Sequence, residues 1–230
     1  MKCSAVVVAA GSGSRIKSEI PKQLLHLGGI PLFLWSLHVF QKMEKVNEIL
    51  LVVPRDKAGN FRELLPDGSE VKWVTGGPRR QDSVKAGLER VSLDAQIVLI
   101  HDAARPFFSP QLVDRLIDSA AEQGASIPVA PVSETLKEVS QGRVIRTLSR
   151  EQIYRAQTPQ AFRREILIEI FQSVPQDRTW TDEASMLEFA GVPVAAVQGD
   201  QRNIKITLAE DFHYAEYLLS QMKLEAPDHK

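Results

Sequence analysis

Buried strands and amphipathic helices alternate along the chain. Continuous apolar runs, which are typical of parallel strands covered on both faces, occupy residues 3–10, 48–54, 96–103 and 126–132, and shorter strands are expected at 71–75 and 193–199. Helical spacing of apolar residues predicts helices over 31–42, 81–91, 163–173, 182–190 and 207–221. This alternation predicts an α/β fold with a single doubly wound, mostly parallel sheet.

Capping residues predict where several helices start. Ser109 is a good N-cap, and Pro110 suits the first position of the helix that follows it. Thr207 and Glu210 match a capping box at the start of the last helix. Asp82 is expected to cap the helix around it rather than to contact a ligand.

One segment interrupts the alternation. Residues 135–139 and 143–148 flank the tripeptide Ser140-Gln141-Gly142, which is typical of a β-hairpin turn. Both strands are mostly polar, and an isolated hairpin is marginally stable in water. We therefore expect the hairpin to pack against a second subunit. The predicted organisation is one domain over 1–224, with 134–150 as an inserted arm and 225–230 as a tail.

Composition excludes several classes of protein. The 230 residues carry 28 Lys plus Arg and 29 Asp plus Glu, a net charge of -1, without the basic excess typical of nucleic-acid binders. The single cysteine, Cys3, permits no intrachain disulfide and fits a reducing compartment. No apolar run reaches the ~18 residues of a membrane helix. The run after Lys2 leads into a glycine loop rather than a cleavage site, which favours a first strand in a cytoplasmic protein over a signal peptide.

A glycine loop with two cations follows the first strand. Gly11 and Gly13 lack the third glycine of a dinucleotide fingerprint, since Ile16 stands there, and the loop lacks the Gly-Lys-Ser/Thr of a Walker motif. Glycines still allow backbone N–H groups to approach an anion closely. With Arg15 and Lys22 added, the loop suits a triphosphate; a tight turn with two solvated charges is the structural alternative.

Polar motifs follow the predicted strands at their carboxyl ends. They occupy residues 11–22, 76–83, 101–106 and 203–205. Because open α/β sheets bind ligands beyond the carboxyl ends of their strands, these motifs predict one shared site.

These motifs resemble the sugar-phosphate nucleotidyltransferases, and specifically the 2-C-methyl-D-erythritol 4-phosphate cytidylyltransferase family. The resemblance covers residues 3–219 and rests on AAGSGSRIKSEIPKQ (9–23), GG with RQDSV (76–84), HDAARP (101–106), ETLK (134–137), RAQTPQ (155–160), TDEAS (181–185) and NIKIT (203–207). It implies a Rossmann-like nucleotidyltransferase fold, and transfer of a cytidylyl group from CTP to an alditol phosphate in isoprenoid precursor synthesis. It also implies Mg²⁺ or another divalent cation, and a homodimer with shared sites.

The resemblance implies a role for each matching residue. Arg15 and Lys22 would stabilise the transition state at the α-phosphate, and Lys205 and Arg150 would orient the attacking phosphate. Asp102 would bind the metal, directly or through water; capping of its own loop is the alternative. The implied CTP contacts are Ala10, Gly11, Gly13, Gly77, Ser83 and Ala103. The implied acceptor contacts are Arg105, Thr135 and Thr158, with Thr135 and Arg150 reaching the neighbouring subunit through the arm. Pro78 departs from some relatives and lacks an N–H donor.

The implied chemistry needs charge neutralisation rather than a general base. A phosphate monoester has its second pKa near 6, so the nucleophile is largely ionised at pH 7. In agreement, the histidines form no base constellation, and His101 is expected to be structural. Lys205 alternates with Ile204 and Ile206 as in a strand, so its side chain is expected to point away from the core.

Three other functions remain as alternatives. The similar D-ribitol-5-phosphate cytidylyltransferases differ mainly around the acceptor alcohol. A non-catalytic nucleotide-binding protein on the same scaffold is disfavoured by the intact set of Arg15, Lys22, Asp102 and Lys205. A redox enzyme is disfavoured by the missing third glycine.

Overall fold

The computed structural model describes residues 1–11 and 22–222. In this part of the chain, eight strands form one sheet in the order β10-β7-β11-β6-β1-β4-β5, with β12 paired to β7. Their bounds are β1 (Cys3–Val8), β4 (Val46–Val53), β5 (Lys72–Thr75), β6 (Ile97–Asp102), β7 (Ala125–Pro131), β10 (Tyr154–Ala156), β11 (Gln160–Arg163) and β12 (Ala195–Gln198). Each apolar run predicted as a strand is therefore confirmed.

The sheet is mostly parallel, as predicted. Strands β6, β1, β4 and β5 run parallel to one another, and β12 runs parallel to β7. Two antiparallel strands were not predicted: β11 lies between β6 and β7, and β10 pairs with β7. A second small unpredicted pair is β2 (His26–Leu27) with β3 (Ile30–Pro31).

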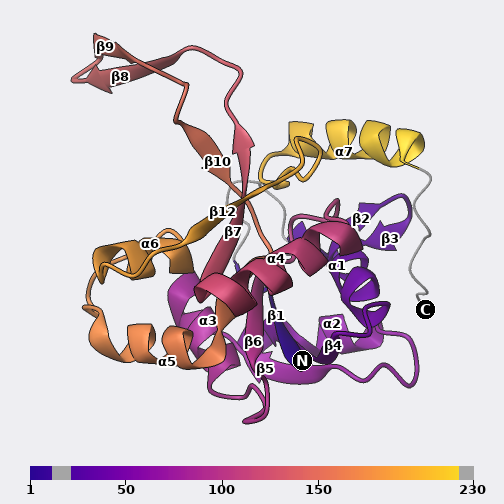
Figure 1. The fold of residues 1–230 in the computed structure, drawn as a ribbon. Coiled ribbons are helices and arrows are strands. Elements are labelled where there is room, and N and C mark those ends of the chain that lie inside the picture. Colours follow the sequence, from indigo (N-terminus) through magenta and orange to yellow (C-terminus); the bar gives the residue numbers. More distant parts are fainter. Residues whose placement is uncertain (12–21, 223–230) are drawn as a thin grey trace.

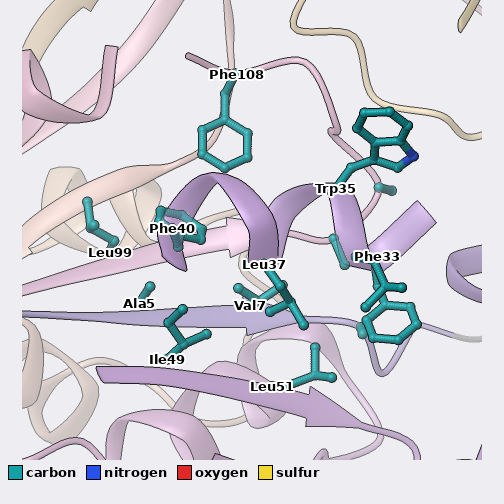
Figure 2. Packing of buried hydrophobic residues seen from close by; sticks show 14 of the residues in the cluster. Ala5, Val7, Phe33, Trp35, Leu37, Phe40, Ile49, Leu51, Leu99 and Phe108 are labelled. Carbon is teal, nitrogen blue, oxygen red and sulfur yellow. The ribbon is translucent and has the colours of Figure 1, made fainter. Parts of the chain in front are cut away.

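Helices cover both faces of the sheet (Figure 1). The apolar residues of α1 (Leu32–Gln41), α2 (Ala58–Glu63), α4 (Pro110–Gln123) and α7 (Ala209–Gln221) join one core, and those of α3 (Arg80–Leu88), α5 (Arg164–Ser173) and α6 (Glu183–Phe189) join the other. Strand β1 is buried throughout and divides its side chains between the two cores: Ala5 and Val7 face one, Val6 and Val8 the other. Figure 2 shows Leu37 of α1 packed close to Val7. This two-sided burial explains why β1 reads as a continuous apolar run.

The predicted helix starts are right for α4 and wrong in detail for α7. Ser109 caps α4, with its hydroxyl accepting from the Leu112 N–H at 3.2 Å. In α7 the N-cap is Leu208, so the third helical residue is Asp211 rather than Glu210. The Asp211 carboxylate accepts from the N–H of Leu208 at 2.8 Å. Only the half of the predicted box in which the third helical residue accepts from the N-cap N–H is present, displaced by one residue, since Leu208 has no side-chain acceptor.

The predicted hairpin is present as β8 (Leu136–Ser140) paired with β9 (Arg143–Leu148). Gln141 and Gly142 both have positive φ, as a tight type I′ turn requires. The hairpin projects away from the sheet (Figure 1). Val139, Val144 and Ile145 expose 58–63% of their surface there. Among the described residues, no helix has the length and apolar character needed to cross a membrane.

Candidate active site

Four distant segments meet at the carboxyl end of β6. Asp102 is the last residue of that strand and lies opposite Val8 of β1. Its carboxylate oxygen Oδ1 accepts from Arg80 Nε at 2.9 Å, and Oδ2 accepts from Lys205 Nζ at 2.5 Å. Arg80 Nη1 also donates to both carboxylate oxygens of Glu183, at 2.8 and 3.0 Å. The first residues of α3 and α6 and the segment after β12 are thus joined to β6 by charge.

Opposite charges keep Asp102 ionised despite its burial. Burial alone would raise the pKa of its carboxyl, but the charges of Arg80 and Lys205 outweigh burial and hold the pKa well below its ordinary value. Burial also raises the pKa of Glu183, against the attraction of Arg80. Because the Asp102 carboxylate stays charged, it can bind another cation in place of Arg80 or Lys205.

His101 and Thr158 fix the position of Asp102 through buried hydrogen bonds. The backbone N–H of Asp102 donates to Thr158 Oγ1 at 3.1 Å, and the same hydroxyl lies 3.1 Å from His101 Nδ1. His101 Nε2 lies 3.2 Å from the carbonyl oxygen of Arg105, which can only accept, so the proton is assigned to Nε2 and Thr158 donates to Nδ1. Burial lowers the pKa of His101 to about 3. The expected structural role of His101 is confirmed.

Lys205 lies in a segment without regular secondary structure, not in a strand as its pattern suggested. The segment is fixed on both sides of the lysine. Asn203 is fully buried and donates from Nδ2 to the Thr158 carbonyl at 2.9 Å, and the Ile206 N–H donates to the Ala104 carbonyl at 2.9 Å. The predicted direction is right: Ile206 is buried, whereas the Lys205 side chain is 34% exposed. Tertiary hydrogen bonds replace the strand ladder.

Arg105 joins the same cluster. Its Nη1 donates to the Asn203 carbonyl at 2.8 Å and its Nη2 to the Ala156 carbonyl at 3.3 Å. Burial lowers the pKa of its guanidinium, and the nearby Asp102 opposes that effect. Within the described residues, the buried Nε of Arg105 and Nη2 of Arg80 have no hydrogen-bond partner. Each arginine therefore has one buried donor without a partner among these residues.

The loop after β5 packs tightly against the end of β1. A Cβ added to Gly76 would lie 2.5 Å from the Ala10 Cβ and 2.8 Å from Ser83 Oγ. The Gly77 N–H donates to Ser83 Oγ at 3.1 Å. Asp82 accepts from the Arg79 backbone N–H at 3.1 Å, which confirms it as a helix cap. Ala10, Gly77 and Ser83, three predicted nucleotide contacts, are thus brought together.

Other predicted residues lie in different surroundings. Ala103 is fully buried, and Gly11 accepts through its carbonyl from Gln23 Nε2 at 3.1 Å. Thr135 and Arg150 are exposed on the arm, where Arg150 donates to the Ser133 carbonyl. Gly13 and Arg15 lie outside the described residues. Lys22 begins the 3-10 helix η1 (Lys22–Leu24), and its side chain also lies outside the described part.

Sequence reasoning assigned no role to Arg80, Glu183 or Asn203. All three stand inside motifs that were singled out, RQDSV, TDEAS and NIKIT. The signal that could have found them was a charged or amide residue at the end of a buried strand or the start of a helix. Their pairing is a tertiary property, since 103 residues separate Arg80 from Glu183.

Comparison with known proteins agrees with this geometry. The sequence matches the family model of 2-C-methyl-D-erythritol 4-phosphate cytidylyltransferase over residues 3–221. The chain belongs to this family. It is a nucleotidyltransferase, and the fold and function implied by the sequence motifs are confirmed at the level of the family. The ribitol-phosphate and non-catalytic alternatives are not favoured.

Individual relatives of this cytidylyltransferase are similar over nearly the whole of this chain. The cytidylyltransferase of Syntrophus aciditrophicus (strain SB) is 41% identical over 226 residues, covering 96% of this chain and 97% of the relative. The crystal structure of the Thermus thermophilus cytidylyltransferase has a TM-score of 0.81 at 34% identity, covering 96% of this chain and 100% of the other. A bifunctional IspD/IspF enzyme of Desulfotalea psychrophila (strain LSv54 / DSM 12343) is 41% identical over 97% of this chain, which spans only 58% of that longer protein.

Proposed function

We propose that the cluster around Asp102 is where this enzyme transfers a cytidylyl group from CTP to 2-C-methyl-D-erythritol 4-phosphate. The observation that carries this proposal is the convergence of Asp102, Lys205, Arg80 and Arg105 at the carboxyl end of the parallel strands. Ligands of open α/β sheets bind at that edge. A chain with one cysteine suits the cytoplasm, where we place the reaction.

The reaction is a displacement at phosphorus. An oxygen of the acceptor phosphate forms a bond to the α-phosphorus of CTP, the bond from that phosphorus to the bridging oxygen breaks, and pyrophosphate leaves with the electron pair. The nucleophile is already ionised, so the barrier is mainly the repulsion between two anions. We assign charge neutralisation to Arg15 and Lys22, and orientation of the acceptor phosphate to Lys205 and Arg150. The place of Arg105 beside Asp102 and Asn203 supports its contact with the acceptor.

The nucleotide is assigned to the glycine-rich edge of the site. Ala10, Gly77 and Ser83 lie close together at the ends of β1 and β5, which supports a shared base or ribose pocket. Gly11, Gly13 and Ala103 complete the proposed CTP contacts. Thr158 is buried with its hydroxyl engaged by His101 and the Asp102 N–H, which favours positioning of Asp102 over direct contact with the acceptor.

The donor set fits a divalent cation that arrives with CTP. No group of three or more His, Cys, Asp or Glu residues that could hold a metal occurs among the described residues. Mg²⁺ commonly binds through one carboxylate together with substrate phosphates and water, and Asp102 offers such a carboxylate. When bound there, the ion would neutralise triphosphate charge. Lys205 donates to Oδ2 of Asp102, and it is the partner that the ion would displace from this carboxylate.

The arm is proposed to join two subunits. Its strands expose Val139, Val144 and Ile145, and a projecting hairpin with exposed apolar residues gains stability when another chain covers it. In a homodimer, Thr135 and Arg150 of each chain would complete the acceptor site of the other.

Pyrophosphate release tests the proposed reaction. The enzyme is offered CTP and Mg²⁺ with either methylerythritol phosphate or ribitol phosphate, and UTP and ATP replace CTP as controls. Turnover is expected with CTP and methylerythritol phosphate only. Turnover with ribitol phosphate alone would reassign the acceptor, and no turnover with either would overturn the proposed reaction.

A further inference from the structure

Arg80 joins two buried carboxylates that belong to different elements. Its Nη1 donates to both oxygens of Glu183, and its Nε donates to Oδ1 of Asp102. We propose that Arg80, anchored by Glu183, is a positioning residue that fixes the Asp102 carboxylate for the nucleotide and its cation. This inference rests on the proposed function of the site.

The side chains become more exposed from Glu183 toward Lys205. The Glu183 side chain is 0% exposed, that of Asp102 is 11%, that of Arg80 is 23% and that of Lys205 is 34%. The Arg80–Glu183 pair therefore contacts Asp102 from the interior of the protein, and Lys205 contacts it from the more exposed side. Oδ1 is held by the anchored partner, which leaves Oδ2 as the oxygen that can exchange Lys205 for a ligand.

The shape of the guanidinium explains why an arginine stands here. Its nitrogens lie in one plane at fixed spacing, so one side chain can hold two carboxylates in a set relative orientation. A lysine ammonium supplies the same charge as a single point and cannot fix both groups in this way. The geometry of Asp102 should therefore depend on arginine itself and not only on positive charge.

Stability alone is a weak reason for this arrangement. Removing buried charges from water costs free energy, and apolar side chains of similar volume often serve a core equally well. Glu183 is the first residue of α6, and its neighbour Asp182 already caps that helix, accepting from the Ser185 N–H at 3.0 Å. Glu183 is thus not needed as the cap, and its carboxylate is directed to Arg80 instead.

Two conservative variants and a matched control test the role of the pair. Arg80→Lys keeps the positive charge between the two carboxylates but loses the planar guanidinium that binds both. Glu183→Gln keeps the shape of the Glu183 side chain but loses its negative charge. Glu48→Gln is the control: Glu48 is 8% exposed and paired with Lys72 near the amino end of β4, away from Asp102. It also accepts from Ser4 Oγ at 2.6 Å.

The measurements are kcat and KM for CTP across Mg²⁺ concentrations, calorimetric binding of CTP with Mg²⁺, and the thermal midpoint of each folded variant. We expect Arg80→Lys and Glu183→Gln each to weaken nucleotide binding or kcat/KM by about 10- to 100-fold, as is typical when a supporting partner of a ligating group is lost. The double variant should lose little more than either single variant, because the two residues act as a unit.

Glu48→Gln should lower the thermal midpoint while its kinetics and binding stay at wild-type values. If Arg80→Lys and Glu183→Gln behave like Glu48→Gln, the pair is only structural and the inference is overturned. A wild-type enzyme that binds CTP but releases no pyrophosphate would instead contradict the proposed function, so the two failures are distinguishable.

Discussion

His101 and Asp102 are neighbours at the end of β6, yet their surroundings drive their charges in opposite directions. Asp102 faces Arg80 and Lys205, which keep its carboxylate charged. The His101 side chain points into the core that is shared with α1 and α4, where Phe40 and Phe108 pack against its ring at centroid distances of 5.6 and 4.3 Å. The alternation of strand side chains places one on the ligand side and the other in the interior.

The buried His101 should make stability depend on pH. Its pKa is lowered from 6.5 to about 3, so the unfolded chain binds a proton that the folded chain does not accept between these values. Its contribution is full above about pH 6.5 and is lost as pH falls from there toward 3. The slope approaches about 1.4 kcal/mol per pH unit for one proton.

Urea unfolding between about pH 7.5 and 5 checks this prediction with His101→Gln. The variant starts less stable, because it loses ring packing, but its free energy of unfolding should fall less steeply with decreasing pH than that of the wild type. Parallel slopes would show that His101 does not carry the dependence.

Gly76 should tolerate no side chain. The added methyl group of Gly76→Ala would lie 2.5 Å from the Ala10 Cβ and 2.8 Å from Ser83 Oγ, so the loop after β5 must shift away from these two residues. Overpacking of this kind typically costs about 1–3 kcal/mol, and here it also displaces the proposed nucleotide contacts. Weaker CTP binding measured by calorimetry, together with a lower urea midpoint, is the expected result.

Gly59→Ala is the matched control for Gly76→Ala. Nothing lies within 4 Å of a Cβ added there, and the residue lies inside α2. Alanine at a compatible helical position stabilises by up to about 1 kcal/mol. If both variants bind CTP like the wild type, the tight approach at Gly76 is not required for the site.

At the scale of elements, local pattern predicted the strands and helices but not every neighbour. Strand β11 has four residues, follows a turn, and pairs antiparallel with β6 and β7, so its place depends on partners distant in sequence. The segment around Lys205 has strand-like alternation, but Asn203 and Ile206 bind loops instead of a ladder. In both cases tertiary hydrogen bonds decide the outcome.

The candidate site was predictable where a residue type carries its own chemistry. Asp102 stood out because a charged residue at the end of a buried strand faces ligand, whereas Lys205 stood out only through its place in the NIKIT motif. The Arg80–Glu183 pair was not predictable, because neither residue reveals in the sequence that it binds the other. Packing supplies that information only once α3 and α6 lie on the same face of the sheet.

At the scale of the whole molecule, the proposed dimer predicts rescue between inactive chains. Arg150→Ala removes a residue that the arm would lend to its neighbour, and Lys22→Ala removes one that each chain would keep for its own site. Refolding the two variants together should give hybrid dimers with one complete site each. Since half of a random mixture is hybrid, activity should recover to about one quarter of the wild type.

Pyrophosphate release by the mixture, compared with each variant refolded alone, measures this rescue. Size-exclusion chromatography confirms that all samples contain dimers. A mixture no more active than its components would contradict a site shared between subunits.

The position of β1 in the sheet sets an order of events during synthesis. Among the described strands, β1 is synthesised first, yet it lies between β4 and β6 with a neighbour on each edge. A nascent chain that ends before residue 97 can cover only one of those edges. The centre of the sheet is therefore completed only after β6 has been made, and a strand that is buried along its whole length must wait until then.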